Sequence, residues 1–307
     1  MPARARLLGE ESVHRLVSGD FEAVFLPGAG MLGVSLRHRG AEILRRVDDL
    51  DGAFTQGGTA GIPLLHPWAN RLAQWRYRAA GRDVDLDSAS PLLHRDANGL
   101  PIHGVPWSML AWDVSTATPT LLGARLDWTR DDLLAVFPFP HRLEIAVRLA
   151  GNGLTLQTTL VAGPGNPVPL SFGFHPYLGL PGLPRDEWRL TLPAMRRLEL
   201  DALGIPTGAE EAFEALDAVL GEFDFDDGFA LLDERTSLSL SGGGRRVSVE
   251  FLAGYRFAQI YAPRGREFVA LEPMTAPTNA LASGTGLRLV NPGAGFSAAF
   301  RIRVEST

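Results

Sequence analysis

Two residues of the sequence combine a reactive type with an unusual setting. Glu272 ends the apolar run 268–271 and stands directly before Pro273. A carboxylate in such a place is costly unless it is paired or used for chemistry. His175 lies among aromatic residues and precedes Pro176, which restricts the histidine to extended backbone and so fixes the direction of its imidazole. Because an imidazole titrates near neutral pH, the two residues are candidates for general acid–base catalysis.

Two proline-rich segments offer fixed hydrogen-bonding groups. Asn70 and Arg71 end the segment 61–71, which reads GIPLLHPWANR, and His103 lies in the segment 101–107, which reads PIHGVPW. A rigid loop that presents Asn and Arg suits the binding of hydroxyl oxygens. Each candidate also has a structural interpretation: an arginine that ties loop carbonyls together, a hydrogen-bonded structural histidine and, for Glu272, a strand-end glutamate that faces solvent.

The composition excludes several classes of chemistry. The 307 residues include no cysteine, which removes disulfides, thiolate catalysis and zinc sites that need sulfur. They include no lysine either, so a Schiff-base lysine and a P-loop lysine are absent. The net charge is −6 and the 29 basic residues are spread along the chain, which argues against a nucleic-acid partner.

The dominant period of the apolar residues is two. Residues 142–149 alternate between polar and apolar, and residues 154–160 resume the alternation after the turn Gly151-Asn152-Gly153. This pattern predicts a β-hairpin in which Asn152 and Gly153 supply positive φ angles. Alternation recurs at 247–251 and 296–304, and 34 glycines and 22 prolines interrupt the chain. We therefore predict an all-β sandwich or barrel that forms a single domain over residues 1–307.

A few segments depart from this pattern. Phe213, Leu216 and Leu220 recur at helical spacing and predict a short helix over 210–220, while residues 242–244 (GGG) predict a loop tip. Residues 1–6 open with charge and no long apolar run follows, so we expect no signal peptide, no membrane-spanning helix and a cytoplasmic location. Five further histidines are expected in surface or loop positions: His14, His38, His66, His94 and His141.

Four motifs, taken in order, resemble the aldose 1-epimerase (galactose mutarotase) family. They are Gly-x-Pro-Leu-Leu-x-Pro-Trp-x-Asn-Arg ending at Arg71, His-Gly at His103, His-Pro-Tyr at His175, and Glu-Pro-x-Thr-x-x-x-Asn-Ala starting at Glu272. Each motif is short, and their order and combination carry the resemblance, which covers about residues 61–281. The resemblance implies a large antiparallel β-sandwich, the galactose mutarotase-like supersandwich.

The resemblance also implies an isomerase of carbohydrate metabolism that needs no metal and no cofactor. Glu272 would be the general base on the anomeric hydroxyl, and His175 the general acid on the ring oxygen. The ring would open to an aldehyde and close again in either configuration. The expected partner is a small sugar such as glucose or galactose, bound by a monomer or a homodimer.

The same resemblance assigns sugar contacts. Arg71 and His103 match positions around the ring and its hydroxyls, and Asn70 is expected to brace the site. The segment 225–229 reads FDDGF, in which the spacing favours Asp226 as a hydroxyl ligand while Asp227 stays open. The further expectations are a hydroxyl contact from Gln259 and stacking on the apolar sugar face by Trp68 or Phe174.

Three alternatives stay open on the same residues. A hexose-6-phosphate mutarotase would need extra cations, for which Arg76, Arg78 or Arg264 are available. A non-catalytic carbohydrate-binding module would need no acid–base pair. A glycoside hydrolase would need a second carboxylate, which would have to be Asp226. Residues 178–180 read Leu-Gly-Leu where the family usually has Phe-Asn-Leu, so the preferred sugar is left open.

Overall fold

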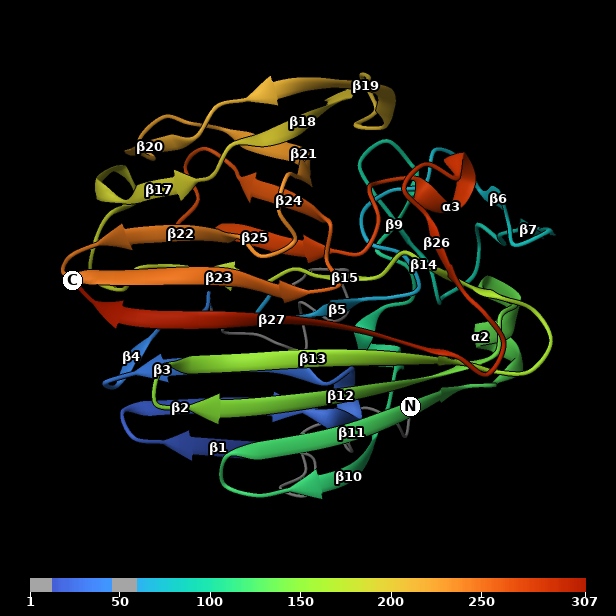
Figure 1. Cartoon of the computed structure of the whole chain (residues 1–307), viewed down its shortest axis with the longest axis horizontal. Coiled ribbons are helices and arrows are strands. Elements are labelled where there is room, and N and C mark those ends of the chain that lie inside the picture. The colour runs from blue at the N-terminus through green and yellow to red at the C-terminus, as the bar shows by residue number, and fades with distance from the viewer. Residues whose placement is uncertain (1–12, 46–59) are drawn as a thin grey trace.

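The computed structural model describes residues 13–45 and 60–307. The expectation about residues 1–6 lies outside these residues. Antiparallel strands make up most of the described chain, as Figure 1 shows. No helix in the described ranges is both long enough and apolar enough to cross a membrane.

The larger sheet has nine strands, and its order brings together distant parts of the chain. The hairpin 141–162 pairs with the last strand, which in turn pairs with a strand from residues 245–253. In sheet order the strands are β10 (Asp113–Ala117), β11 (Leu121–Trp128), β12 (His141–Ala150), β13 (Gly153–Ala162), β27 (Gly295–Ser306), β23 (Arg245–Ala253), β22 (Ser237–Gly242), β17 (Arg189–Leu192) and β20 (Leu216–Val219).

The second sheet has eight strands and carries the residues of chemical interest. In order its strands are β19 (Pro206–Phe213), β18 (Met195–Leu200), β21 (Phe225–Leu231), β24 (Phe257–Ala262), β25 (Val269–Met274), β15 (Gly173–Phe174) and β5 (Leu64–Leu65), and β16 (Tyr177–Leu178) also pairs with β25.

Smaller elements complete the fold. A four-stranded sheet comprises β1 (His14–Ser18), β2 (Phe21–Leu26), β3 (Leu32–His38) and β4 (Ala41–Glu42). Three two-stranded pairs are β6 (Arg76–Ala79) with β7 (Arg82–Asp85), β8 (His94–Arg95) with β9 (Pro101–Ile102), and β14 (Val168–Leu170) with β26 (Arg288–Val290). The helices α2 (Asp131–Val136) and α3 (Ala280–Ser283) are short, as are the 3-10 turns Pro27–Ala29, Trp107–Met109 and Arg185–Glu187.

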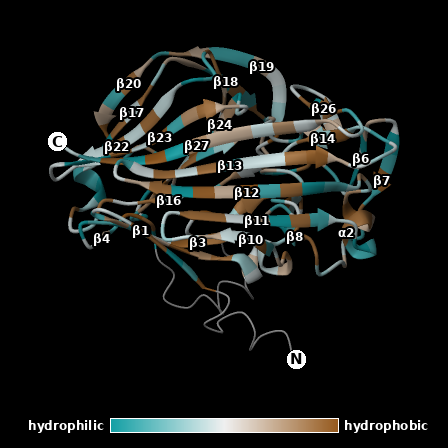
Figure 2. Ribbon diagram, turned by 60° about the horizontal axis from the view of Figure 1, so that its bottom comes forward, coloured by the Kyte–Doolittle hydropathy of each residue, from teal (hydrophilic) through white to brown (hydrophobic). Residues whose placement is uncertain are grey.

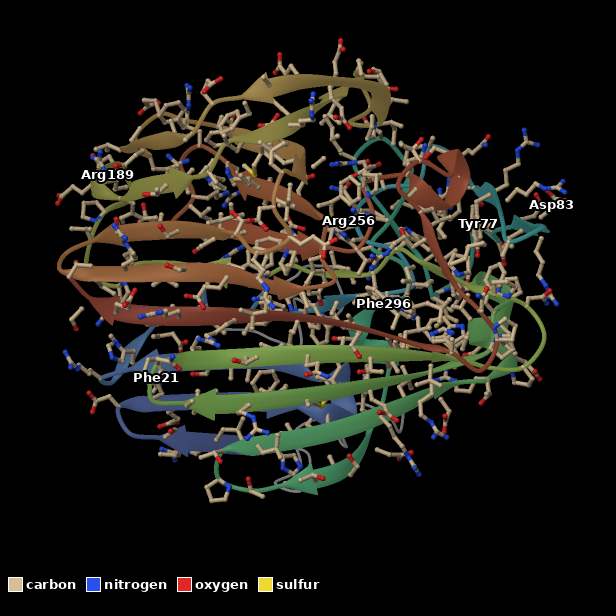
Figure 3. The ribbon with its side chains drawn as sticks, viewed as in Figure 1. Phe21, Tyr77, Asp83, Arg189, Arg256 and Phe296 are labelled. Atoms are coloured by element: carbon tan, nitrogen blue, oxygen red, sulfur yellow. The ribbon has the colours of Figure 1, made fainter. Side chains whose placement is uncertain are left out.

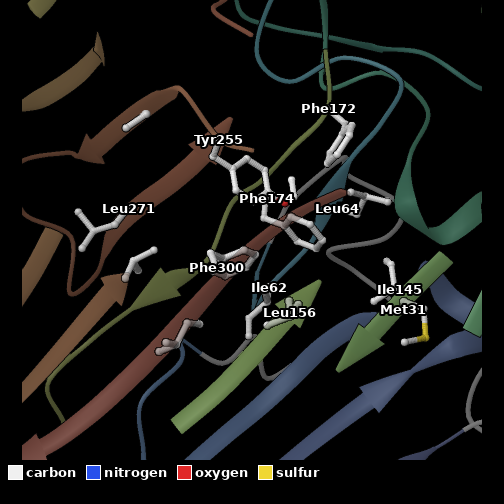
Figure 4. Packing of buried hydrophobic residues seen from close by; sticks show 14 of the residues in the cluster. Met31, Ile62, Leu64, Ile145, Leu156, Phe172, Phe174, Tyr255, Leu271 and Phe300 are labelled. Atoms are coloured by element: carbon white, nitrogen blue, oxygen red, sulfur yellow. The ribbon is translucent and has the colours of Figure 1, made fainter. Parts of the chain in front are cut away.

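The side chains on the inner faces of the sheets form the hydrophobic core. Along β12 buried and exposed residues alternate without a break, a pattern that Figure 2 shows as alternating hydropathy. Phe174 and Phe300 from different sheets pack with ring centroids 5.1 Å apart, and Tyr255 contacts Phe300 at 5.9 Å (Figure 4). Charged side chains such as Asp83 and Arg189 point outward (Figure 3). The prediction of an antiparallel β-sandwich is confirmed.

The predicted hairpin over 142–160 is confirmed as β12 and β13, but one detail of its turn differs. Of Asn152 and Gly153, only Gly153 has a positive φ, at 142°. A Cβ atom on Gly153 would lie 2.2 Å from the carbonyl oxygen of Ile302. The glycine therefore permits the close approach of β27. The loop tip at residues 242–244 is also confirmed, since it is the turn that joins β22 to β23.

The helix predicted over 210–220 is wrong, because this segment forms β19 and β20. Phe213 packs against Phe229 with ring centroids 5.1 Å apart, and Leu216 pairs with Leu192 of β17. Three apolar residues over so short a stretch fit either type of element. Pairing with β18 and β17 satisfies the backbone groups of the segment and decides the outcome.

The expectation that His66 and His141 are surface or loop residues is wrong, since both are buried, as is His38. Nε2 of His66 lies 3.0 Å from Nε2 of His141, and Nδ1 of His141 lies 2.6 Å from the carbonyl oxygen of Phe139. Because that carbonyl can only accept, His141 donates to it and accepts the proton of His66. Burial lowers the pKa of His66 far below its usual value and that of His141 to about 4.

These two histidines predict a loss of stability in acid. Below pH 6.5 the unfolded chain binds protons at both positions that the folded protein does not bind, so the free energy of unfolding falls as the pH falls. Each histidine contributes up to about 1.4 kcal/mol per pH unit. Urea unfolding measures the free energy of unfolding at pH 7.5 and at pH 5.0. The difference between these two free energies should be smaller in the double variant His66→Gln/His141→Gln than in the wild type.

The control is His14→Gln on β1, which should leave that difference as in the wild type. An equal dependence on pH in the wild type and the double variant would contradict the assignment of this acid sensitivity to the buried pair.

Candidate active site

A cavity of about 230 Å³ opens beside strands β21, β24 and β25. Figure 1 shows these three strands side by side. Most of the cavity lining is polar or aromatic, and the loops before β6 and after β9 close its other side. The lining residues are Asn70, Arg71, Ile102, His103, His175, Tyr177, Asp226, Tyr261 and Glu272.

Strand register places four polar residues on one face of the second sheet. Asp226 of β21 lies opposite Tyr261 of β24, and Gln259 of β24 lies opposite Glu272 of β25. Alternate residues of a strand point to the same face, so these four side chains share a face. Asp227 points to the other face, where Nη2 of Arg197 donates to its Oδ1 at 2.6 Å. Of the two aspartates left open by the sequence, Asp226 lines the cavity and Asp227 does not.

Two left-handed residues shape the loops that face the sheet. Asn70 has φ 58° and His103 has φ 62°, a region that few residues other than glycine adopt. The amide of His103 donates to the carbonyl of Asn70 at 2.9 Å, and the amide of Asn70 lies 3.3 Å from Nδ1 of His103. Because Nδ1 accepts this proton, the neutral imidazole carries its own proton on Nε2. His103 can therefore donate a hydrogen bond to a ligand oxygen.

Two residues without an assigned role in the sequence hold this loop in place. Asp96 accepts from Nε of Arg71 at 2.8 Å and from the amides of Asn98 and Leu100. Asn279 has φ 65°. Its backbone amide donates to the carbonyl of Arg71, and its side-chain Oδ1 accepts from the backbone amide of Ala73, both at 2.9 Å. Asn279 stands in the fourth motif, whereas nothing in the sequence connects Asp96 with Arg71.

His175 and Glu272 meet in the interior of the cavity. Nε2 of His175 lies 3.1 Å from Oε1 of Glu272, and the exposed fractions of the two residues are 4% and 1%. The ring of Tyr177 stacks on the imidazole, with centroids 4.2 Å apart, and its hydroxyl lies 3.4 Å from Nε2. Oε2 of Glu272 is buried and has no hydrogen-bond partner in the described part of the chain.

The electrostatics of the cavity shift three pKa values. Burial raises the pKa of Glu272 well above its usual value; the charge of Asp226 adds to this rise, and Arg71 opposes it. Burial lowers the pKa of His175 well below its usual value, and His103 adds to the effect. Burial also lowers the pKa of His103 to about 3, helped by Arg71, so this imidazole is neutral at neutral pH.

Arg71 and Gln259 fix Asp226 at the cavity wall. Nη2 of Arg71 lies 3.6 Å from Oδ2 of Asp226, and Nε2 of Gln259 donates to its Oδ1 at 2.8 Å. Gln259 is buried and is not among the residues that line the cavity, so it contacts a lining residue instead. The sequence therefore identified six of the lining side chains, which are Asn70, Arg71, His103, His175, Asp226 and Glu272.

The aromatic residues expected to stack on a sugar lie elsewhere. Trp68 and Phe174 are each 1% exposed and belong to the core, where Phe174 packs on Phe300. The aromatic walls of the cavity are Tyr177 and Tyr261. Tyr261 was within reach of sequence reasoning, because it stands two residues after Gln259 on a strand and must share its face.

The arginines considered for a phosphate do not line the cavity. Arg76 and Arg78 lie exposed on β6, where Arg78 pairs with Asp83 at 3.2 Å. Arg264 pairs with Glu222 at 3.2 Å.

Known proteins resemble this chain over nearly its whole length. The family model described as aldose 1-epimerase matches residues 20–303. An uncharacterized protein of Escherichia coli (strain K12), YihR, is 25% identical over 291 residues, which are 91% of this chain and 88% of YihR. A galactose mutarotase-like protein of Clostridium acetobutylicum has a TM-score of 0.84 and 19% identity, with 95% of each chain covered. A galactose 1-epimerase of Lactobacillus acidophilus NCFM has a TM-score of 0.73 and 15% identity, with 94% of this chain and 92% of that chain covered.

The two neighbouring aspartates allow a test of the cavity electrostatics. Asp226→Asn removes a negative charge near Glu272 and frees Arg71 from one partner, so the pKa of Glu272 should fall. Asp227→Asn is the matched control and should leave that pKa in place, because its side chain faces Arg197 on the other side of the sheet. Carbon-detected NMR titration of the Glu272 carboxyl measures its pKa in each variant. Equal shifts in the two variants would contradict the described register.

Proposed function

The chain belongs to the aldose 1-epimerase family, and on that basis we propose that it interconverts the α and β anomers of a free aldose such as glucose or galactose. The observation that carries the proposal is the 3.1 Å contact between His175 and Glu272 in a cavity lined by hydrogen-bond donors and acceptors. Ring opening and ring closure each require one group that donates a proton and one group that accepts a proton, and this pair provides both.

In the proposed reaction the two groups have the roles that the family resemblance implies. The carboxylate of Glu272 takes the proton of the anomeric hydroxyl while the imidazolium of His175 gives a proton to the ring oxygen. The bond between C1 and the ring oxygen breaks, and its electron pair stays on that oxygen. The product is an open-chain aldehyde with a free hydroxyl. After rotation about the C1–C2 bond, the C5 hydroxyl oxygen attacks the other face of C1. The imidazole of His175 takes the proton of that hydroxyl, and the carboxyl of Glu272 gives its proton to the carbonyl oxygen.

The pair needs only one mobile proton for this cycle. A carboxylate beside an imidazolium starts ring opening, and a protonated carboxyl beside a neutral imidazole is the state that opening leaves behind. Burial raises the pKa of Glu272 and lowers that of His175, so the site favours the second state when no ligand is bound. The two states differ only in the position of that proton, so the pKa values belong to the coupled pair and not to either residue alone.

The remaining polar groups are suited to hold the sugar. His103 offers its Nε2 proton, Arg71 offers its guanidinium, and Asp226 accepts hydroxyl protons. Asn70 braces this arrangement, since its Oδ1 accepts from the amide of Arg71 at 2.8 Å and from Nη1 at 3.2 Å. Gln259 orients Asp226 from behind. These contacts support recognition of a neutral polyol.

The alternatives from the sequence are less well supported. A plain carbohydrate-binding module needs no acid–base pair, and a buried carboxyl–imidazole contact costs stability. A glycoside hydrolase would need Asp226 as its second carboxylate. That side chain is held by Arg71 and Gln259 and is therefore suited to binding more than to acid–base work.

The test is polarimetry of freshly dissolved α-D-glucose and α-D-galactose with the purified protein. We expect the wild type to accelerate the change in optical rotation, and we expect Glu272→Gln and His175→Asn each to lower kcat about 100-fold or more, as loss of a general acid or base does. The variants Glu305→Gln and His14→Asn exchange the same residue types away from the cavity and should retain full activity. A wild type that accelerates neither sugar would overturn the proposal.

A further inference from the structure

The same five-residue turn occurs twice in the chain. Residues 96–100 read DANGL, and residues 201–205 read DALGI. In each turn the amide of the aspartate donates to the carbonyl of the fifth residue at 2.9 Å, and Oδ1 of the aspartate accepts from the amides of the third and fifth residues at 2.8 to 3.0 Å. The fourth residue is a glycine, with φ 77° in one turn and 75° in the other. We call these segments the first and the second aspartate turn.

Both aspartate turns meet the guanidinium of Arg71, which lines the cavity. In the first turn Oδ2 of Asp96 accepts from Nε at 2.8 Å. In the second turn Gly204 lies against the group, since a Cβ atom on this residue would be 3.3 Å from Nη1. Nη1 also donates to Oδ1 of Asn70 at 3.2 Å. Because the guanidinium is planar, these contacts direct Nη2 toward Asp226, whose Oδ2 is 3.6 Å away.

The second aspartate turn shows that this backbone conformation does not need an arginine. Among the described residues Asp201 has no ion-pair partner, yet its turn has the same hydrogen bonds as the first. Burial alone would raise the pKa of the Asp96 carboxyl, but hydrogen bonds from Leu100, from Arg71 and from a second turn amide lower it below its usual value. The first turn therefore holds an anion whose Oδ2 is not required for the turn itself.

We propose that Asp96 is a positioning residue that sets the orientation of Arg71 for sugar binding. This inference rests on the proposed mutarotase function and concerns how the same site holds its substrate. The side chain of Asp96 is 5% exposed, and a carboxylate in such a place costs stability that the turn gives no reason to spend. It contacts Arg71 and the turn amides but neither His175 nor Glu272. Asp96 should therefore act on KM and leave kcat unchanged.

The test is Asp96→Asn, which keeps Oδ1 for the turn amides and replaces Oδ2 with an NH₂ group that cannot accept from Nε. Mutarotation is measured with whichever of D-glucose and D-galactose the wild type accelerates. We expect KM to rise about tenfold at constant kcat, the effect of one lost hydrogen bond to a charged group. A fall in kcat as large as the rise in KM would indicate general damage to the loop and would overturn the positioning role.

The matched control is Asp201→Asn, which makes the same substitution at the same place of the second aspartate turn. Its carboxylate is exposed and does not touch Arg71, so KM and kcat should both stay as in the wild type. This control shows whether any change in a turn beside the guanidinium is enough to weaken binding. Equal effects of Asp96→Asn and Asp201→Asn would contradict a role of the ion pair.

A double-mutant cycle with Arg71→Gln shows whether Asp96 acts through Arg71. In the Arg71→Gln background, Asp96→Asn should raise KM no further, because the guanidinium that it orients is gone. A further rise of about tenfold would mean that Asp96 acts by another route, and the positioning role would be wrong.

The orientation of Arg71 can also be measured without any reaction. Heteronuclear NMR follows the exchange of its Nε proton with water, which should be about tenfold faster in Asp96→Asn than in the wild type or in Asp201→Asn. Equal exchange in all three proteins would overturn the positioning role. A wild type that accelerates neither sugar would overturn the mutarotase function and with it the effect on KM, while the exchange rates would still support or overturn the orientation of Arg71 by Asp96.

Discussion

A carboxyl group and an imidazole that touch inside a protein lose most of their solvation, so the surrounding chain must hold them. Glu272 and His175 are 1% and 4% exposed, and each takes its position from β-structure of the second sheet or its margin. Glu272 lies within β25, while His175 lies between β15 and β16, which both pair with that strand. The contact between them is thus set by strand pairing, which is more precise than two mobile loops would be.

The other side of the cavity depends on backbone conformations that are rare outside glycine. Asn70, His103 and Asn279 all have positive φ angles, and their hydrogen bonds join the loops at 70–73 and 103–104. Gly104 is needed here, because a Cβ at this residue would lie 2.4 Å from the carbonyl oxygen of His66. Such local strain is common where a structure must present side chains to a ligand. The loops are therefore as closely specified as the strands.

The sequence predicted the sheets and much of the cavity, for identifiable reasons. Period-two alternation is a local property, so the hairpin over residues 142–160 could be predicted from the sequence. The order of the motifs identified Glu272 and His175. The helix predicted over residues 210–220 was wrong, because the pairing of this segment with β17 and β18 depends on tertiary contacts and not on the local sequence. Asp96 could not be found, since only the folded loop brings it to Arg71. The choice between Asp226 and Asp227 needed the register of β21 against β24, which no local pattern contains.

The order of the nine-stranded sheet has a consequence for how the chain is made. β27 (Gly295–Ser306) lies in the middle of that sheet, between β13 and β23. During synthesis the hairpin of β12 and β13 leaves the ribosome long before its neighbour exists. One edge of the hairpin therefore stays unpaired until residues 295–306 emerge. An open strand edge is a template for wrong pairing with other chains. The nascent protein thus passes through a long interval in which it is exposed to association with other chains, and that interval ends only when its final strand is inserted.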